Sequence, residues 1–271
     1  MENIGLITGK GNLPVILAKN ISKNYKDIRI FAVGFSGSIN KKIKKFVSEF
    51  HTIPFGSFGK LIEYLNLKNI KKILMAGLVS HRKLFDKNLK LDDHAKKIFE
   101  NIKDNKADSI LGSIADEFEK NGVEVLPMLD FLKENIAEEG VLTKTEPSQN
   151  QKQDIEFGFE IAKELSRLDI GQTIVVKNRC VVAVESIEGT DLCLLRAGKL
   201  AGEDTVILKI AKFHQDPRFD LPIIGPKTIK IMKKIKSKVL AIESGKTCIV
   251  DKEKVIQLAN KYKISIVGLK R

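Results

Sequence analysis

The sequence predicts an α/β protein built from two domains. Apolar runs of strand length alternate with helix-like segments through the first half, which is typical of a parallel sheet covered by helices. The first predicted strand leads through a glycine loop into a helix, as nucleotide-binding α/β units begin. In the second half the predicted strands and helices follow one another in a different order, and two of the strands are predicted to form a hairpin. We therefore expect an N-terminal Rossmann-like parallel sheet with helices and a second, C-terminal α/β domain with a mixed sheet.

The boundary between the domains is expected where the composition becomes polar and rich in turns, at 138–149. We assign residues 1–137 to the Rossmann-like nucleotide-binding domain, 138–150 to a linker and 151–271 to the C-terminal domain. Because 43% of the residues are hydrophobic, the chain can bury a core and disorder is not expected.

The strands and helices of the first half follow one another in order. Strands are short apolar runs, expected over 4–8, 28–34, 51–54, 72–76 and 123–127. Helices repeat apolar residues at helical spacing, as Phe58, Leu61 and Leu65 do. They are expected just after Pro14 and over 58–67, 89–99 and 107–121, with short helical runs at 41–45 and 130–136.

The second half begins with a helix predicted over 151–168, in which Ile155, Phe159 and Ala162 form an apolar stripe. Asn178-Arg179 joins two apolar runs and predicts a hairpin. The runs are 173–177 and 180–185. A helix over about 191–200 should follow, with Thr190 or Asp191 as its cap. The remaining elements are strands at 205–211, 239–242, 248–251 and 265–269 and helices at 228–236 and 253–262.

Two loops that follow predicted strands are candidates for ligand binding. The residues Gly9, Gly11, Asn12 and Leu13 come after the first strand, and the segment 77–80 comes after the fourth. Ligands of open parallel sheets bind outside the carboxyl ends of the strands, and amides at a helix N-terminus favour phosphate. Pro14 replaces the third glycine of a dinucleotide motif, which disfavours a dinucleotide cofactor. A plain tight turn is the alternative.

The segment 216–225 concentrates charge in a loop bounded by two prolines and a glycine, so it should be ordered and not helical. Asp216 and Asp220 could hold a divalent cation, and Arg218 could clamp a phosphate. The alternative is a charged surface turn with a local Asp–Arg pair.

Glu188, Asp191, Arg196 and Lys212 also lie in or beside turns of the second half. Carboxylates with basic neighbours match magnesium-assisted chemistry on phosphate, although Asp191 is equally suited to cap a helix. Neither the cysteines nor the histidines have zinc-binding spacing.

The net charge of +13 suits an anionic partner: nucleic acid, a phosphorylated metabolite or an anionic membrane surface. Aromatic residues make up only 6% and do not interleave with basic ones, so nucleic acid is not expected. No apolar run has membrane-spanning length, and the first residues lack the features of a signal peptide. We therefore expect a cytoplasmic protein.

Six motifs occur in a specific order along nearly the whole chain, at 5–14, 76–80, 116–122, 167–172, 183–191 and 216–225. Together they resemble the UDP-2,3-diacylglucosamine pyrophosphatases of lipid A biosynthesis, the LpxI family. The chain departs from the family pattern after Ser80, where His81-Arg82-Lys83 stands in place of a frequent Arg-Pro.

The resemblance implies hydrolysis of the pyrophosphate bond of UDP-2,3-diacylglucosamine to UMP and 2,3-diacylglucosamine 1-phosphate (lipid X), with Mg²⁺ or another divalent cation. Asp220 would bind the metal or activate water, and Asp191 would be a second metal ligand. Asp216 and Arg218 complete the catalytic candidates. The segment 151–271 would then be the catalytic and lipid-substrate domain. Candidate substrate contacts are Gly9, Gly11, Asn12, Leu13, Gly77, Val79, Ser80, Gln172, Thr190, Asp191 and Lys212.

The partner hypotheses follow from this substrate. A diacylated nucleotide sugar must leave a bilayer, which implies transient, peripheral contact with the cytoplasmic face of the inner membrane. A homo-oligomer is a further hypothesis. The alternatives in function are a non-catalytic nucleotide-sugar binding or regulatory protein, a nucleic-acid binder and a dehydrogenase.

Overall fold

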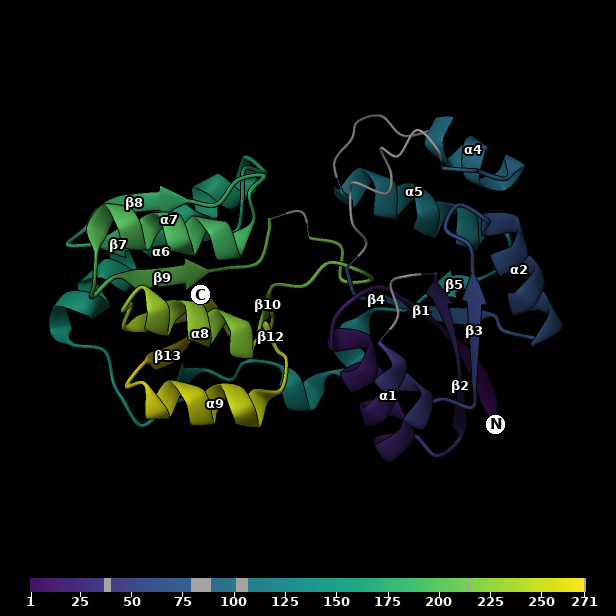
Figure 1. Cartoon of the computed structure of the whole chain (residues 1–271), viewed down its shortest axis with the longest axis horizontal. Helices are drawn as coiled ribbons and strands as arrows, with labels where there is room; N and C mark the ends of the chain where they lie inside the picture. The colour runs from purple at the N-terminus through teal and green to yellow at the C-terminus, as the bar shows by residue number, and fades with distance from the viewer. Residues whose placement is uncertain (37–39, 79–88, 101–106, 214, 271) are drawn as a thin grey trace. The chain divides into compact units, whose positions relative to one another are not determined.

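The computed structural model describes residues 1–36, 40–78, 89–100, 107–213 and 215–270 (Figure 1). The chain divides into two compact units. Unit 1 comprises Met1–Leu132 together with Asp216–Asp220, and unit 2 comprises Lys133–Gln215 and Leu221–Arg271. The charged loop thus belongs with unit 1, although we placed it in the domain 151–271, because Phe219 packs on the core of unit 1.

Unit 1 contains a five-stranded sheet in the order β3-β2-β1-β4-β5, and all its pairs are parallel, as predicted. The strands are β1 (Glu2–Thr8), β2 (Ile28–Phe35), β3 (Glu49–Ile53), β4 (Lys72–Ala76) and β5 (Glu124–Val125). From β1 the chain moves outward to β3 and then crosses back to β4. The order of the strands therefore reverses between β1 and β4, which is where open α/β sheets bind ligands.

The helices of unit 1 cover both faces of this sheet (Figure 1). They are α1 (Leu13–Asn24), α2 (Phe58–Leu67), α4 (Asp93–Glu100) and α5 (Ala107–Lys120), with 3₁₀ turns η1 (Lys41–Lys45) and η2 (Met128–Phe131). Phe58, Ile98 and Phe118 of α2, α4 and α5 share one core with Val33 and Met75 of the sheet.

Two predicted helical segments of the first half differ in the structure. The helix expected over 89–99 begins only at Asp93, because the Asp92 carboxylate accepts hydrogen bonds from the backbone N–H groups of Ala95 and Gly59, both at 2.8 Å. The segment 130–136 forms parts of two 3₁₀ turns, η2 and η3 (Lys133–Asn135), and not one helical segment.

Unit 2 contains a six-stranded mixed sheet in the order β6-β13-β11-β9-β7-β8, as predicted for the second domain. The strands are β6 (Gly140–Val141), β7 (Thr173–Lys177), β8 (Cys180–Val184), β9 (Val206–Lys209), β11 (Val239–Glu243) and β13 (Ser265–Leu269). β9, β11 and β13 are parallel to one another, and β6 and β7 pair antiparallel with their neighbours. β6 lies within 138–150, which we expected to be a linker. A separate parallel pair joins β10 (Ile223–Ile224) to β12 (Cys248–Ile249).

The helices of unit 2 are α6 (Gln149–Arg167), α7 (Thr190–Ala201), α8 (Pro226–Lys234) and α9 (Lys252–Lys261). Phe159 of α6 packs with Val176 on one face of the sheet, and Leu194 of α7 packs with Val175 on the other. α8 and α9 add Met232 and Val255 to the second core. The side chains of successive residues in β7 therefore pack into different cores, because neighbouring side chains of a strand point to opposite faces of the sheet.

The predicted hairpin is confirmed. β7 and β8 are joined by Asn178 and Arg179, whose φ angles are +51° and +53°, as a type I′ turn requires. The buried carboxylate of Asp154 on α6 accepts hydrogen bonds from both turn amides, at 3.0 and 2.6 Å. α6 thereby fixes the position of the turn.

None of the helices in the described ranges is both long and apolar enough to cross a bilayer.

Candidate active site

Two glycine loops of unit 1 join at the carboxyl ends of the adjacent strands β1 and β4. Lys10 and Leu78 exchange backbone hydrogen bonds of 2.8 and 2.9 Å. Gly9 has no room for a side chain, because a Cβ would lie 2.6 Å from the carbonyl oxygen of Leu78. Gly77 adopts φ +95° and a Cβ there would lie 2.8 Å from the carbonyl oxygen of Lys10. The two glycines thus allow the predicted loops to approach each other.

Asn40, a residue that the sequence did not single out, holds the first glycine loop from the loop after β2. Its amide nitrogen donates to the carbonyl oxygen of Gly11 at 3.2 Å and to Oδ1 of Asn12 at 3.0 Å. Asn12 occupies the N-cap position of α1, and Leu13 is the first residue of that helix. Gly11 has φ +104° with open space around its α-carbon. This position therefore needs glycine for its backbone conformation.

The loop Asp216–Asp220 forms a compact turn in unit 1. The backbone N–H groups of Phe219 and Asp220 both donate to the carbonyl oxygen of Asp216, at 3.3 and 2.9 Å. The guanidinium of Arg218 binds the Asp216 carboxylate through Nε and Nη2 and donates from Nη1 to Glu119 on α5, at 2.6 Å. Arg218 thereby attaches the loop to unit 1 through two carboxylates.

The Asp216 carboxylate stays ionised within this turn. Partial burial alone would raise its pKa, but the hydrogen bonds from the Arg218 side chain and backbone outweigh burial and leave the pKa below its ordinary value. Asp216 and Arg218 are thus bonded to each other, as the local-pair alternative predicted.

In unit 2 a polar cluster lies at the start of α7. The buried ammonium group of Lys209, at the end of β9, donates to the hydroxyl oxygens of Thr190 at 2.8 Å and Thr173 at 3.3 Å. The Thr190 hydroxyl donates to Oε1 of Glu185 at 2.9 Å. Since a hydroxyl has one proton, the Thr190 side chain has none left for a ligand.

The predicted cap of α7 was wrong. Gly189 with φ +79° occupies the N-cap position and Thr190 is already the first helical residue. Glu185 and Lys209 use the hydroxyl of Thr190, so it does not cap the helix. Asp191 lies in the first turn of α7, where its carboxylate is 2.5 Å from the ammonium of Lys227 on α8.

Gln172 and Lys212 lie at the same edge of the sheet of unit 2. The backbone oxygen of Gln172 accepts from the N–H of Ile210 at 2.9 Å, and Lys212 lies 3.6 Å from Asp169. The preceding residue, Ala211, donates its N–H to the buried carboxylate of Glu243 at 3.0 Å. Glu243 also binds Lys163 and Lys246, so this network positions the segment that carries Lys212.

The predicted site residues therefore form two groups, one in each unit. Asp216, Arg218, Asp220 and the glycine loops belong to unit 1, and Gln172, Thr190, Asp191 and Lys212 belong to unit 2. Val79, Ser80 and the segment 81–83 lie outside the described residues. Asp220 and Asp191, the predicted metal ligands, are in different units. Among the described residues, no three His, Cys, Asp or Glu side chains form a metal-binding group.

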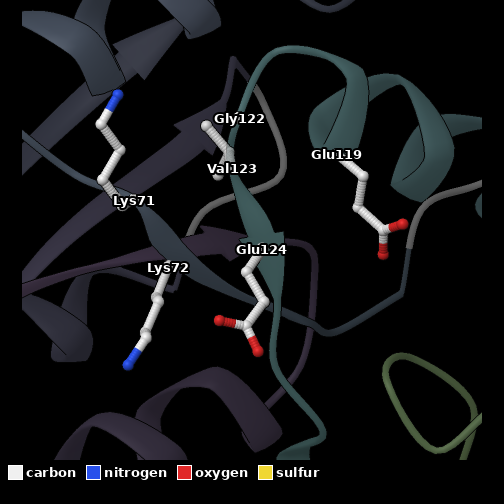
Figure 2. Close-up of a pocket in the computed structure, with 6 residues that line it drawn as sticks. All are labelled: Lys71, Lys72, Glu119, Gly122, Val123 and Glu124. Carbon is white, nitrogen blue, oxygen red and sulfur yellow. The ribbon is translucent and has the colours of Figure 1, made fainter.

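A pocket of about 400 Å³ opens in unit 1 at the end of the sheet opposite the glycine loops (Figure 2). It is lined by Lys71, Lys72, Glu119, Gly122, Val123 and Glu124. Lys72 and Glu124 begin β4 and β5, so the pocket lies at the amino ends of these strands, away from the glycine loops. Figure 2 shows Lys71 and Lys72 pointing in opposite directions, so the two ammonium groups do not converge on one ligand.

Comparison with known proteins gives consistent results over the whole chain. The family model of the LpxI N-terminal domain matches residues 3–135, and that of the LpxI C-terminal domain matches residues 138–267. A relative from Caulobacter vibrioides, named UDP-2,3-diacylglucosamine pyrophosphatase LpxI, is 31% identical over 281 residues, which cover 99% of this chain and 98% of the relative.

A solved structure, N5-carboxyaminoimidazole ribonucleotide synthetase from Thermotoga maritima, was also aligned with this protein. The alignment covers 69% of this chain and 42% of the synthetase chain. The identity is 13% and the TM-score 0.22, too low to carry an argument about fold or function.

Proposed function

Since the chain belongs to the LpxI family, we propose that it hydrolyses the pyrophosphate bond of UDP-2,3-diacylglucosamine, releasing UMP and lipid X for lipid A synthesis, and that the reaction requires a divalent cation. The observation that carries the proposed activity is the end-to-end match to a relative named for it. Both family domains are present in order, and no large part of the relative is missing.

We assign the central role in the reaction to Asp220. Three contacts fix the turn that carries it. The carbonyl oxygen of Asp216 accepts a hydrogen bond from the backbone N–H of Asp220, and Arg218 binds both Asp216 and Glu119. Phe219 packs against the core of unit 1. A carboxylate on such a turn keeps a defined position, which catalysis by a positioned group needs. Arg218 and Asp216 act in this scheme by holding the turn.

The proposed cofactor is a divalent cation of the magnesium type. Magnesium needs only one or two protein carboxylates, because substrate phosphate oxygens and water complete its shell. Asp220 is the carboxylate that we assign to it, with Asp191 as the second candidate. When bound, the cation would offset the negative charge of the pyrophosphate and lower the pKa of water.

The glycine loops would contact the nucleotide part of the substrate. They lie where the strand order reverses, and backbone amides at the start of α1 suit phosphate oxygens. In unit 2, Gln172, Lys212 and the first turn of α7 are the proposed contacts. We assign the contact at Thr190 to its backbone, because its hydroxyl proton is already bound by Glu185.

The deciding experiment measures UMP release from UDP-2,3-diacylglucosamine with Mg²⁺ and with a chelator, in the wild type and in Asp220→Asn. We expect metal-dependent release in the wild type. The variant should be at least about a thousandfold slower, because the loss of a catalytic carboxylate costs several kcal/mol in the transition state. Asp93→Asn, an exposed carboxylate of unit 1, is the matched control and should react like the wild type.

Each part of the proposal can fail separately. Full release with a chelator present would overturn the metal requirement alone. Normal turnover by Asp220→Asn would overturn the role of Asp220. A folded wild type that binds the substrate and releases no UMP would favour the non-catalytic nucleotide-sugar binding protein.

A further inference from the structure

Asn40 links two loops of unit 1 that leave the sheet at the carboxyl ends of neighbouring strands. β1 and β2 are parallel, and the last residue of β1, Thr8, pairs with Gly34 near the end of β2. The loops that follow these strands therefore start side by side. Gly11 and Asn12 lie in the first loop, and Asn40 lies in the second, directly before η1.

The Asn40 carboxamide uses both its nitrogen and its oxygen in this link. Nδ2 donates to the carbonyl oxygen of Gly11 at 3.2 Å and to Oδ1 of Asn12 at 3.0 Å. Oδ1 accepts a hydrogen bond from the backbone N–H of Lys42 at 3.2 Å and so caps η1. Because the two groups that face Nδ2 are oxygen acceptors, a donor is needed there.

Asn12 stands at the N-cap position of α1 but does not cap the helix. An N-cap asparagine usually has an extended backbone and accepts a hydrogen bond from the second or third helical amide. The second residue of α1 is Pro14, which has no N–H, so the third, Val15, is the remaining donor. The described structure shows no such bond. The Asn12 backbone is in the helical region, with φ −96° and ψ −16°, and its Oδ1 accepts from Asn40.

The start of α1 is therefore suited to an anion. Residues 13–16 of its first turn are uncharged, so the positive end of the helix dipole is not offset by a side chain of this turn. Gly11 precedes the helix with open space where a side chain would stand. A phosphate oxygen is a suitable acceptor for the Val15 N–H that Asn12 does not take.

We propose that Asn40 is a positioning residue for the pyrophosphate substrate. By holding the Asn12 carboxamide off the helix, Asn40 keeps the Val15 N–H available to a phosphate oxygen of the nucleotide part. Asn40 acts through Asn12 and Gly11 and is not itself a contact of the substrate. The inference rests on the proposed function for the identity of the ligand, and on the hydrogen bond between Asn40 and Asn12 for the role.

The size of the effect follows from the strength of a helix cap. Without a donor at position 40, the Asn12 side chain is released to cap α1, and a phosphate must displace that cap to reach Val15. An asparagine cap is equivalent to about a five- to tenfold change in an equilibrium constant, so the affinity for phosphate should fall by about this factor. The chemical step should not change, because Asp220 lies on a different loop.

The test uses two substitutions that remove the donor in different ways. Asn40→Ala takes away the whole carboxamide without adding charge, and Asn40→Asp keeps the oxygen that caps η1. Asn66→Asp is the matched control for charge. Asn66 is exposed near the end of α2, where the carbonyl oxygen of Lys68 accepts from Asn3 near the start of β1, so it lies at the opposite end of the sheet.

Three measurements are made on the full-length protein. Calorimetry gives the Kd of UDP, and UMP release from a short-chain, water-soluble form of the substrate gives KM and kcat. Hydrogen exchange of the Val15 amide is followed by NMR.

In both Asn40 variants we expect Kd and KM to rise about five- to tenfold, with kcat within about twofold of the wild type. The rise should be larger for Asn40→Asp, because the new carboxylate also repels phosphate. The Val15 amide should exchange several-fold more slowly in the variants, because Asn12 then caps it. Asn66→Asp should match the wild type in all three measurements.

Unchanged UDP affinity in both Asn40 variants would overturn the proposal. So would a Val15 amide that exchanges as fast as in the wild type, or a fall in kcat at constant KM. A wild type that binds UDP in an Asn40-dependent way and releases no UMP would support the positioning role and reject hydrolysis. UMP release by a wild type that binds no UDP would overturn the role of Asn40 and leave the proposed function standing.

Discussion

The buried carboxylate of Glu243 is held by three donors from different parts of unit 2: Lys163, Lys246 and the backbone N–H of Ala211. Burial alone would raise its pKa, but the hydrogen bonds from the two lysines and Ala211 outweigh burial and leave the pKa below the ordinary value of 4.5. The folded state therefore binds a proton at this group less readily than the unfolded state does.

The sign of the resulting pH dependence follows directly. The contribution of Glu243 to stability is fully present above the ordinary pKa of 4.5 and is lost as the pH falls through the lower pKa of the folded state. We expect Glu243→Gln to lower the unfolding free energy by about 1–3 kcal/mol at neutral pH, with a smaller difference in acid. Urea unfolding of both proteins at several pH values tests this. A difference that stays constant below pH 4.5 would contradict it.

Lys209 and Glu185 are both buried, and the Lys209 ammonium lies 3.9 Å from the Glu185 carboxylate, which gives a second prediction at this scale. Lys209→Met should cost about 3–5 kcal/mol, because Glu185 then keeps a buried charge without a cation. Adding Glu185→Gln removes that charge and should restore part of the stability. A double-mutant cycle of urea unfolding gives the coupling. Simple additivity of the two losses would show that the groups do not depend on each other.

The sequence singled out several residues whose surroundings the structure now describes, including Asp220 and the glycines of the first loop. It missed Asn40, Glu185, Lys209 and Glu243 as members of networks. Their partners are far away in sequence, as Glu243 is from Lys163, and no local pattern reports such contacts. A lysine inside the apolar run that became β9 was the available signal for Lys209.

At the scale of elements, the contact between the two glycine loops depends on the absence of a side chain at Gly9. Gly9→Ala should lower the stability by about 1–3 kcal/mol, because the new methyl group meets the backbone of Leu78. Gly112→Ala is the matched control: it lies in α5 with nothing within 4 Å of the added Cβ and should raise stability by about 0.5–1 kcal/mol. Thermal unfolding compares the two. Equal tolerance at both sites would refute the close contact.

The hairpin offers a stabilising substitution. Arg179 is exposed and adopts φ +53°, which strains any residue with a side chain. Arg179→Gly gives the Asn-Gly pair preferred in type I′ turns and should raise the unfolding free energy by roughly 0.5–1 kcal/mol. Asn178→Ala, at the other left-handed position, should lower it. Chemical denaturation of the wild type and the two variants measures the unfolding free energies. If neither substitution changed the unfolding free energy, the turn would not be of type I′.

The larger elements were predictable because their patterns are local and long. The five parallel strands, α6 and the hairpin follow from apolar runs, helical spacing and the Asn-Arg turn. β6 and β10 have two residues each and stand among turn-forming residues, whereas β5, equally short, lies within the apolar run 123–127. The start of α7 was misplaced because Thr190 fits a capping pattern, while its hydroxyl is used by Glu185 and Lys209.

At the scale of the whole molecule, the expected division placed the charged loop in the C-terminal domain, since sequence order is the only guide to membership before contacts are known. The structure assigns Asp216–Asp220 to unit 1, where Arg218 reaches Glu119. We expect Glu119→Ala to loosen this loop and to raise the rate of tryptic cleavage after Arg218 several-fold. Glu124→Ala is the control, and peptide mass analysis identifies the cut. Equal cleavage rates would show that Glu119 does not hold the loop.

The membership of Asp216–Asp220 in unit 1 also affects biosynthesis. Unit 1 is complete only when the loop Asp216–Asp220, about 80 positions beyond Leu132, has been synthesised. Because a ribosome adds roughly 5–20 residues per second, unit 1 stays incomplete for several seconds after Leu132 has been added. During that interval the nascent chain exposes the apolar surface that Phe219 later covers. Truncated messages that stop before codon 216 should therefore yield chains that depend on chaperones, even though the whole parallel sheet of unit 1 has already been translated.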